Sequence, residues 1–149
     1  MSKLFIPQSI FLDTNVLLDA ILHREGQESV DTLLALGFKR LIRICISAIS
    51  IVNISYIAHK HVPLKELLKI FNIYHSYYVI LPNDNLCITK AMESDNPDFE
   101  DAVQLACAES GRCAAIVTNN KKHFVPYTDT PVYTPDELLA KLRGESPTP

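Results

Sequence analysis

Acidic residues gather at two places along the chain. Asp13 ends a short apolar run, and four further acids crowd around the start of a later amphipathic segment: Asp95, Asp98, Glu100 and Asp101. A single Asp in front of a helix is usually a capping residue, and acids near a helix N-terminus stabilise it by about 0.3 to 1 kcal/mol each. Capping explains one or two acids better than four. The second cluster therefore indicates a site for a positively charged ligand.

The spacing of these carboxylates allows several of them to act on one ion. Asp98 and Asp101 lie three residues apart and so share one face of a helix, whereas Glu100, an auxiliary acid, points elsewhere and Phe99 lies on the face that packs on the sheet. If Asp13 lies beside them, the carboxylates raise one another's pKa unless a cation compensates. Mg²⁺ or Mn²⁺ suits oxygen ligands, orients a phosphate and lowers the pKa of an attacking water. We predict metal-dependent phosphodiester hydrolysis, with three metal-binding and catalytic residues: Asp13, Asp98 and Asp101.

A third polar stretch follows an apolar run late in the chain. Thr118 and Asn120 stand in the turn after residues 114–117, and Lys121 and Lys122 follow them. Polar residues after a strand are common in turns, so this stretch by itself carries little weight. Beside two acidic clusters, we interpret Thr118 and Asn120 as auxiliary polar groups and the two lysines as contacts for a phosphate backbone.

Apolar runs alternate with helical patterns along most of the chain. The runs predict strands at residues 9–12, 43–46, 78–81, 114–117 and 132–133, and helical periodicity fills the segments between them. Strands separated by helices imply crossover connections, and therefore a parallel sheet covered on both faces. In such sheets functional polar groups lie beyond the carboxyl ends of the strands, where Asp13 would stand. We predict an α/β fold with three α/β/α layers and a central parallel sheet of four to five strands.

Length and composition indicate one domain. With 149 residues, of which 48% are hydrophobic, the chain can bury one core, and we predict a single domain over 1–143 with a flexible tail at 144–149. The net charge of −3 argues against a globally basic nucleic-acid binder but allows a local basic patch. The four cysteines lack a CxxC spacing, which predicts buried, reduced thiols. Neither a secretory signal pattern nor a membrane-spanning run is recognisable, so we expect a cytoplasmic protein that binds no membrane.

Five stretches carry a family resemblance: FLDTNVLLD, ISAISIVNISYI, DFEDAVQLACAES, IVTNNKKHF and TPDELL. Together they resemble the PIN-domain family, small α/β nucleases that include the toxins of VapBC-type toxin-antitoxin pairs. The resemblance implies a PIN-like fold, an Mg²⁺- or Mn²⁺-dependent endoribonuclease activity on single-stranded or structured RNA, an antitoxin partner and a homodimer. Asp13 matches the first metal-site acid of the family and Asp101 the acid of the later helix, with Asp98 as an auxiliary. Thr14 and Asn15 match the polar pair that braces the first loop.

Several positions depart from the family pattern and leave alternatives open. Many PIN domains carry an acid where Asn53 and Asn120 stand here, and His123 also occupies a place where relatives often have an acid; we assign this histidine no role. The two amides motivate an alternative, a catalytically degenerate PIN domain that binds RNA or a protein. A haloacid-dehalogenase-like phosphatase or a response-regulator receiver fits less well. The phosphatase requires Asp where Asn15 stands, and the receiver requires a phosphoacceptor Asp where residues 81–83 read Leu-Pro-Asn.

Overall fold

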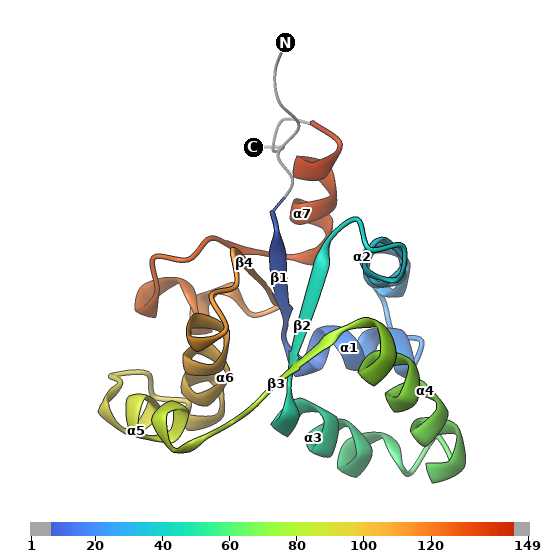
Figure 1. Ribbon diagram of the computed structural model, residues 1–149, viewed down its shortest axis with the longest axis horizontal. Helices are drawn as coiled ribbons and strands as arrows, with labels where there is room; N and C mark the ends of the chain where they lie inside the picture. The colour runs from blue at the N-terminus through green and yellow to red at the C-terminus, as the bar shows by residue number, and fades with distance from the viewer. Residues whose placement is uncertain (1–6, 145–149) are drawn as a thin grey trace.

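A five-stranded parallel sheet forms the centre of the computed structural model, which describes residues 7–144 (Figure 1). The strands lie in the order β3-β2-β1-β4-β5, and every neighbouring pair is parallel. They are β1 (Ser9–Leu12), β2 (Arg43–Ser47), β3 (Val79–Leu81), β4 (Ala115–Val117) and β5 (Val132–Tyr133). The predicted α/β fold with a parallel sheet and helices on both faces is confirmed.

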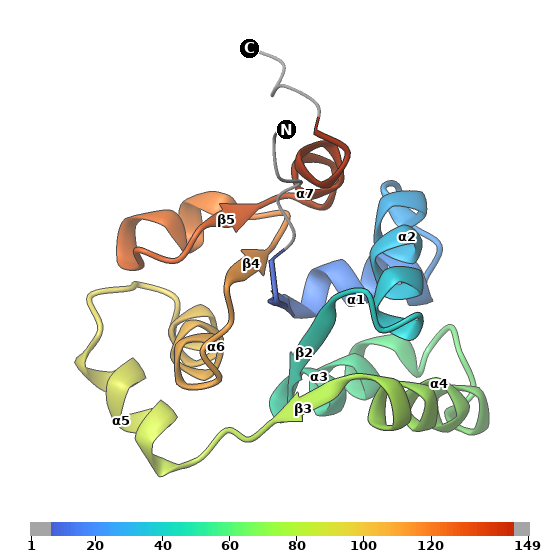
Figure 2. The same cartoon turned by 45° about the horizontal axis from the view of Figure 1, so that its top comes forward.

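The helices form a layer on each face of the sheet. The described part of the chain contains α1 (Thr14–Ile21), α2 (Gln27–Phe38), α3 (Ala48–Ala58), α4 (Leu64–Tyr77), α5 (Asn85–Glu93), α6 (Phe99–Ser110) and α7 (Pro135–Leu142), with two short 3-10 turns, η1 (Lys121–His123) and η2 (Val125–Tyr127). One core joins the sheet to α1–α4 and α7, and the other joins it to α6 with one residue of α5. Figure 2 shows these two groups of helices on opposite sides of the strands.

The central strands are buried on both faces, which explains their continuous apolar sequences. Ile10 and Leu12 of β1 point into the core with α1, whereas Phe11 points into the core with α6. Such double burial is what parallel strands with crossover helices require. Close packing also restricts α2, because a Cβ atom at Gly37 would collide with the side chains of Ile44 and Tyr78. The continuous apolar sequences of these strands therefore indicate that helices cover both faces of the sheet.

Helix N-termini collect at the carboxyl edge of the sheet. α1 and α3 begin directly after β1 and β2, and α6 runs back toward the start of β4 (Figure 1). Asp13, Ser47 and Asp98 are their N-caps, and each side-chain oxygen accepts a hydrogen bond from a backbone N–H of the first turn. Caps of this type satisfy N–H groups that have no partner within the helix. The same edge thus carries both the caps and the acidic residues.

The structure corrects some local predictions. Phe99 does not pack on the sheet: it is the first residue of α6 and its side chain is 52% exposed, while Ala102, Val103 and Ala106 are buried as expected. β3 begins at Val79, one residue later than predicted. All four cysteines are free and buried. Within residues 7–144 no helix has both the length and the hydrophobicity to cross a membrane. Residues 145–149 of the predicted tail lie outside the described residues, and the single-domain boundary stays a prediction.

Candidate metal-binding active site

Asp13 is a buried carboxylate at the carboxyl end of β1. Only 5% of the residue is exposed. Its Oδ1 accepts a hydrogen bond from the Thr14 backbone N–H at 2.8 Å, and its Oδ2 accepts one from the Thr118 hydroxyl at 3.0 Å. Asp13 N–H in turn donates to the carbonyl of Val117, the last residue of the neighbouring β4. The sheet therefore holds this carboxylate at a fixed position.

Asp13 is unusual because its carboxylate is buried and no positive charge of the described residues compensates it. Burial raises its pKa to about 6, the hydrogen bond from Thr118 lowers it, and the negative charges of Asp101 and Glu100 raise it further. Among residues 7–144, the groups that shift the pKa of Asp13 include no cation. A carboxylate in this position gains from a cation, because the cation compensates both the lost hydration and the repulsion.

A network of neutral side chains supports the loop that carries Asp13. Gln104 of α6 is completely buried, and its Nε2 donates to the hydroxyls of Thr14 at 2.9 Å and Ser50 at 2.8 Å. Its Oε1 accepts a hydrogen bond from the Ser47 hydroxyl at 2.6 Å. The hydroxyls of Thr14 and Ser50 lie 2.7 Å apart and share a further hydrogen bond. This network ties α1, α3 and α6 together beneath the acidic residues.

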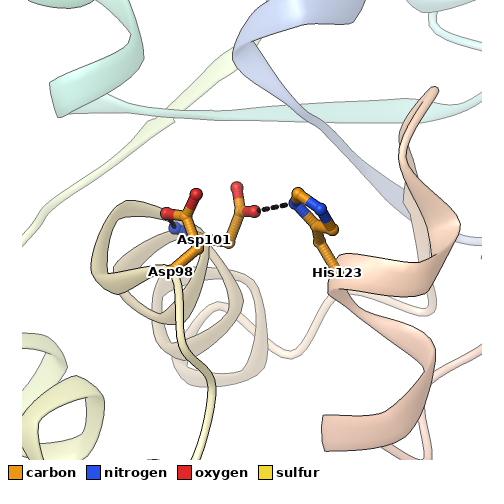
Figure 3. Close-up of side chains that lie close together, drawn as sticks. All are labelled: Asp98, Asp101 and His123. Carbon is orange, nitrogen blue, oxygen red and sulfur yellow. Dashed lines mark hydrogen bonds and ion pairs between the residues drawn. The ribbon is translucent and has the colours of Figure 1, made fainter.

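Asp98, Asp101 and His123 form the outer part of the site (Figure 3). One ligand atom from each of the three lies within 4.8 Å of the others. Asp98 caps α6 through the backbone N–H of Asp101, and His123 Nδ1 lies 2.7 Å from Asp101 Oδ2. Burial raises the pKa of Asp101, and the hydrogen bond from His123 opposes that shift. His123, to which the sequence assigned no role, is therefore a direct neighbour of the candidate ligands.

Glu100 of α6 is exposed and bonds to a side chain of α3. Its Oε1 accepts a hydrogen bond from the Asn53 amide at 3.1 Å, which joins α6 to α3. Burial raises the pKa of Glu100, and the charges of Asp101 and Asp98 raise it further. The Asn53 amide on α3 therefore donates a hydrogen bond to Glu100 of α6. Many PIN domains carry an acid at the position of Asn53, and in this chain the nearby acid is Glu100.

The remaining predicted residues differ in how they contribute. Thr118 is buried and holds Asp13, and it also accepts a hydrogen bond from the Asn120 backbone N–H. Lys121 is paired with Glu137 at 3.0 Å, whereas Lys122 is exposed. Asn15 is exposed, and among the described residues its side chain makes no hydrogen bond, so the expectation that it braces the first loop is wrong. Of this pair, Thr14 is the residue that bonds to the buried network.

The oxygen atoms of the site suit a hard divalent cation. Asp13 and Asp101 interact across the carboxyl edge, and Asp98 stands beside Asp101. Mg²⁺ and Mn²⁺ prefer such carboxylate oxygens, and Mg²⁺ usually takes only one or two of them and keeps several waters. His123 adds a nitrogen at the outer rim that Mn²⁺ accepts more readily than Mg²⁺ does. The carboxylates therefore fit a divalent cation, although the group whose ligand atoms lie within 4.8 Å of one another is Asp98, Asp101 and His123 and does not include Asp13.

A family comparison decides what kind of protein carries this site. A PIN-domain family model matches residues 9–122, well over half of the chain. The chain belongs to the PIN-domain family. The matched range contains the acidic residues, the buried network and the first two residues of η1, and it ends one residue before His123. A comparison with curated protein sequences found no match.

Solved structures with the same fold are toxin-antitoxin proteins. DNA-bound VapBC from Salmonella typhimurium shares 21% identity with this PIN domain, with a TM-score of 0.64 over 85% of this chain and 98% of that one. VapBC2 from Rickettsia felis, bound to a promoter fragment, shares 20% identity, with a TM-score of 0.63 over 83% and 96%. FitAcB from Neisseria gonorrhoeae shares 20% identity, with a TM-score of 0.61 over 85% and 97%. At these identities the likeness establishes the fold.

The buried hydrogen-bond network beneath the acidic residues was not predicted from the sequence. Gln104 is the one strongly polar residue in the apolar stretch 102–108, and Ser47 and Ser50 stand at the start of a strongly apolar helix. A polar side chain on a buried helix face requires hydrogen-bond partners. A single polar residue within an apolar stretch could therefore have indicated a buried network. His123 gave no such signal, because only folding brings it to Asp101.

Proposed function

We propose that this PIN domain is a metal-dependent endoribonuclease and the toxin of a toxin-antitoxin pair. The observation that carries the proposal is the buried Asp13, which has acidic neighbours in Asp101 and Glu100 and, within the described part of the chain, no cationic group acting on it. Such an arrangement favours a divalent cation, and PIN domains are generally metal-dependent nucleases. Asp13 and Asp101 are the proposed inner ligands, and Asp98 is the outer one.

Hydrogen bonds from neighbouring residues orient these ligands, and the outer edge of the site remains for the substrate. A bound Mg²⁺ or Mn²⁺ would lower the pKa of a water and polarise a phosphodiester. Thr118 and Thr14 fix the two oxygens of Asp13, and His123 fixes one oxygen of Asp101. Because these contacts leave little rotational freedom, the carboxylates are held in place before substrate arrives. His123 also stands where it can hold or pass a proton at Asp101 Oδ2.

A small cavity beside the outer ligands supports RNA as the substrate. Its volume is about 210 Å³, and its lining is Asn96, Pro97, Asp98, Lys122, His123 and Tyr127. Cavities that hold whole ligands measure about 300 to 1,000 Å³, so this one suits a single planar base. Tyr127 offers a ring for stacking and Lys122 a charge for the adjoining phosphate. In single-stranded RNA the bases are free to enter such a cavity, so we propose single-stranded segments as the substrate.

An apolar surface on α3 and α4 supports an antitoxin partner. Val52 and Tyr56 lie one turn apart on α3 and are 65% and 76% exposed; Leu64 and Leu68 lie one turn apart on α4 and are 59% and 55% exposed. Exposed apolar stripes on neighbouring helices suit an amphipathic helix of a partner. A solved toxin-antitoxin complex from Klebsiella pneumoniae shares this fold. We propose that the antitoxin covers this α3–α4 surface; a homodimer stays a prediction that light scattering would check.

Cleavage of single-stranded RNA by purified protein tests the proposed activity. We expect cutting with Mg²⁺ or Mn²⁺, none with a chelator, and none for Asp13→Asn. Asp31→Asn, which changes an exposed acid on α2 in the same way, is the matched control and should cut normally. Equal activity of wild type and Asp13→Asn would exclude the nuclease. Intact RNA affinity with no calorimetric signal for Mn²⁺ at millimolar concentration would instead favour the binding module, for which Asn53 and Asn120 argue.

Substitutions on the α3–α4 surface test the proposed partner. We expect Tyr56→Asp and Leu68→Asp to lose binding to the product of the adjacent reading frame while RNA cleavage persists. Met92→Asp, at an apolar position on α5 that is 66% exposed, is the control and should bind normally. If all three variants bind equally well, the antitoxin does not use this surface.

A further inference from the structure

A larger cavity lies at the opposite, amino edge of the sheet. Its volume is about 550 Å³, and its lining includes Gln8 just before β1, Arg43 at the start of β2 and Val79 at the start of β3. In Figure 1, β1 and β2 begin at the top of the view and end at the bottom, where α1 and α3 start, so this amino-edge cavity and the acidic site are separated by the length of the strands. The proposed nuclease reaction does not use it.

Two arginines supply the charge of the amino-edge cavity. Arg40 and Arg43 both line it, and none of the described residues that line it is acidic. Within residues 7–144 neither guanidinium forms an ion pair with a carboxylate. The chain as a whole has a net charge of −3, so two unneutralised arginines at one cavity are a local exception. Guanidinium groups bind phosphate oxygens through paired hydrogen bonds.

An aromatic ring adjoins these charges. Tyr77, at the end of α4, lines the cavity and is 39% exposed. Its ring packs against Phe38 with centroids 4.3 Å apart, which fixes its orientation. The Arg40 guanidinium lies 6.0 Å from the centroid of the Tyr77 ring, at the outer limit of a cation–π contact, so the charge and the ring border a common space. A ring held in this way can stack on a nucleobase.

Arg40 occupies a backbone position that normally belongs to glycine. It follows the end of α2 with φ of 60°, in the left-handed region. The Arg40 N–H donates to the Gly37 carbonyl and the Leu41 N–H donates to the Leu36 carbonyl, which is the Schellman pattern of a helix end. Glycine adopts this conformation without strain, whereas a residue with a side chain does not. The chain turns at Arg40 toward β2, and both Arg40 and Arg43 line the cavity.

We propose that the amino-edge cavity binds a nucleotide, with its phosphate on Arg40 and Arg43 and its base against Tyr77. The volume lies within the range of cavities that enclose a small ligand. A phosphate alone would not use the ring, and an apolar ligand would not use the arginines, so the combination selects a phosphate attached to a planar ring. A free mononucleotide and a nucleotide within a strand both have this chemistry.

Binding of defined probes to the metal-free protein tests the proposal. With chelator present, we expect adenosine 5′-monophosphate to shift the backbone amide signals of Gly37, Leu41 and Tyr78 in nuclear magnetic resonance spectra. Adenosine alone and inorganic phosphate alone should each bind about tenfold or more weakly, because each lacks half of the contacts. A six-nucleotide oligoadenylate separates the two sources: tighter binding than the monophosphate identifies a strand, and weaker binding identifies a free nucleotide.

Matched arginine substitutions distinguish the cavity from nonspecific charge. Arg40→Gly should lower affinity for the monophosphate about tenfold and still fold, because glycine suits this backbone position. Arg112→Gly is the control: Arg112 follows α6 with φ of 55° and does not line the cavity, so affinity should change less than twofold. Arg43→Gln should behave as Arg40→Gly does. Equal losses for Arg40→Gly and Arg112→Gly, or no binding of the monophosphate at millimolar concentration, would overturn the proposal.

Discussion

The two edges of the sheet carry opposite charges for a shared reason, yet only one edge contains a buried charge. The helices begin at the carboxyl edge and end at the amino edge, so Asp98 at an N-terminus and Arg40 at a C-terminus both complement the helix dipole. Asp13 differs from both, because it is buried and has acidic neighbours. Helix dipoles therefore account for the sign of the charge at each edge, and the burial of Asp13 is the feature on which the proposed cation site rests.

The edges also differ in how their polar groups are held. Beneath the carboxyl edge, Gln104 connects Ser47, Ser50 and Thr14 in a fully buried network. Among the described residues, the arginines of the amino edge form no comparable bonds with other side chains. A rigid edge suits catalysis, which requires fixed ligands, whereas an adaptable edge suits ligand binding. Substitutions at each edge of the sheet test this difference in rigidity and charge.

After the loss of cleavage expected for Asp13→Asn, the largest effect is expected from Asp101→Asn at the carboxyl edge. An amide keeps the shape of the side chain but removes the charge that a metal requires, so RNA cleavage should fall at least about a hundredfold. Initial cleavage rates and calorimetric Mn²⁺ affinity should fall together. Asp136→Asn, at an exposed position on α7, serves as the control. A fall in cleavage with unchanged Mn²⁺ affinity would show that Asp101 is not a metal ligand.

Gln104→Leu should destabilise the carboxyl edge without touching a ligand directly. The substitution leaves buried hydroxyls with fewer partners, and we expect a loss of about 2 to 3 kcal/mol in the free energy of unfolding. Urea unfolding measures this loss. Thr89→Ala, which removes one exposed hydroxyl bond on α5, should cost less than about 1 kcal/mol. Comparable losses from both substitutions would mean that the buried network does not rigidify this edge.

The pH dependence of stability should reveal the ionisation of Asp13. Its pKa rises from 3.8 to about 6 on folding, so the native state binds this proton more tightly than the unfolded chain does. The resulting stabilisation is fully present below about pH 4 and is lost as pH rises through 6; a shift of about two units corresponds to about 3 kcal/mol. In chelator, Asp13→Asn should gain stability over wild type between pH 4.5 and 7.5. A stability difference between the two proteins that does not vary with pH would contradict this assignment.

The smallest effect is expected at the amino edge. Arg40→Gly removes the cost of a left-handed arginine and should raise the free energy of unfolding by up to about 1 kcal/mol. Chemical denaturation of this variant and of Arg112→Gly, which stands in the same conformation, gives the comparison. A gain at both positions would show that the chain carries an avoidable strain at each helix end. A loss for Arg40→Gly alone would show that its side chain contributes stability rather than ligand binding.

Most of the fold could be predicted from local patterns. The alternation of apolar strands and amphipathic helices predicted the parallel sheet, and the helix caps Asp84 and Ser47 are residue types that favour this position. Phe99 was placed on the wrong face, because the helix begins at Phe99 itself and the first turn does not yet follow the buried stripe. Helical periodicity could not predict the partner of Glu100 either, because it compares residues on one helix, while Glu100 interacts with Asn53 of another.

The sequence alone determined the family, the layers and the acids that could bind a metal, because these depend on residue types at short spacings. The tertiary structure decided which groups meet: His123 reaches Asp101 across the gap between η1 and α6, and Gln104 reaches Thr14 across 90 positions of chain. It also decided that Arg40 and Arg43 share a cavity with Tyr77. Contacts between distant segments depend on how helices pack on the sheet, and no local pattern encodes that packing.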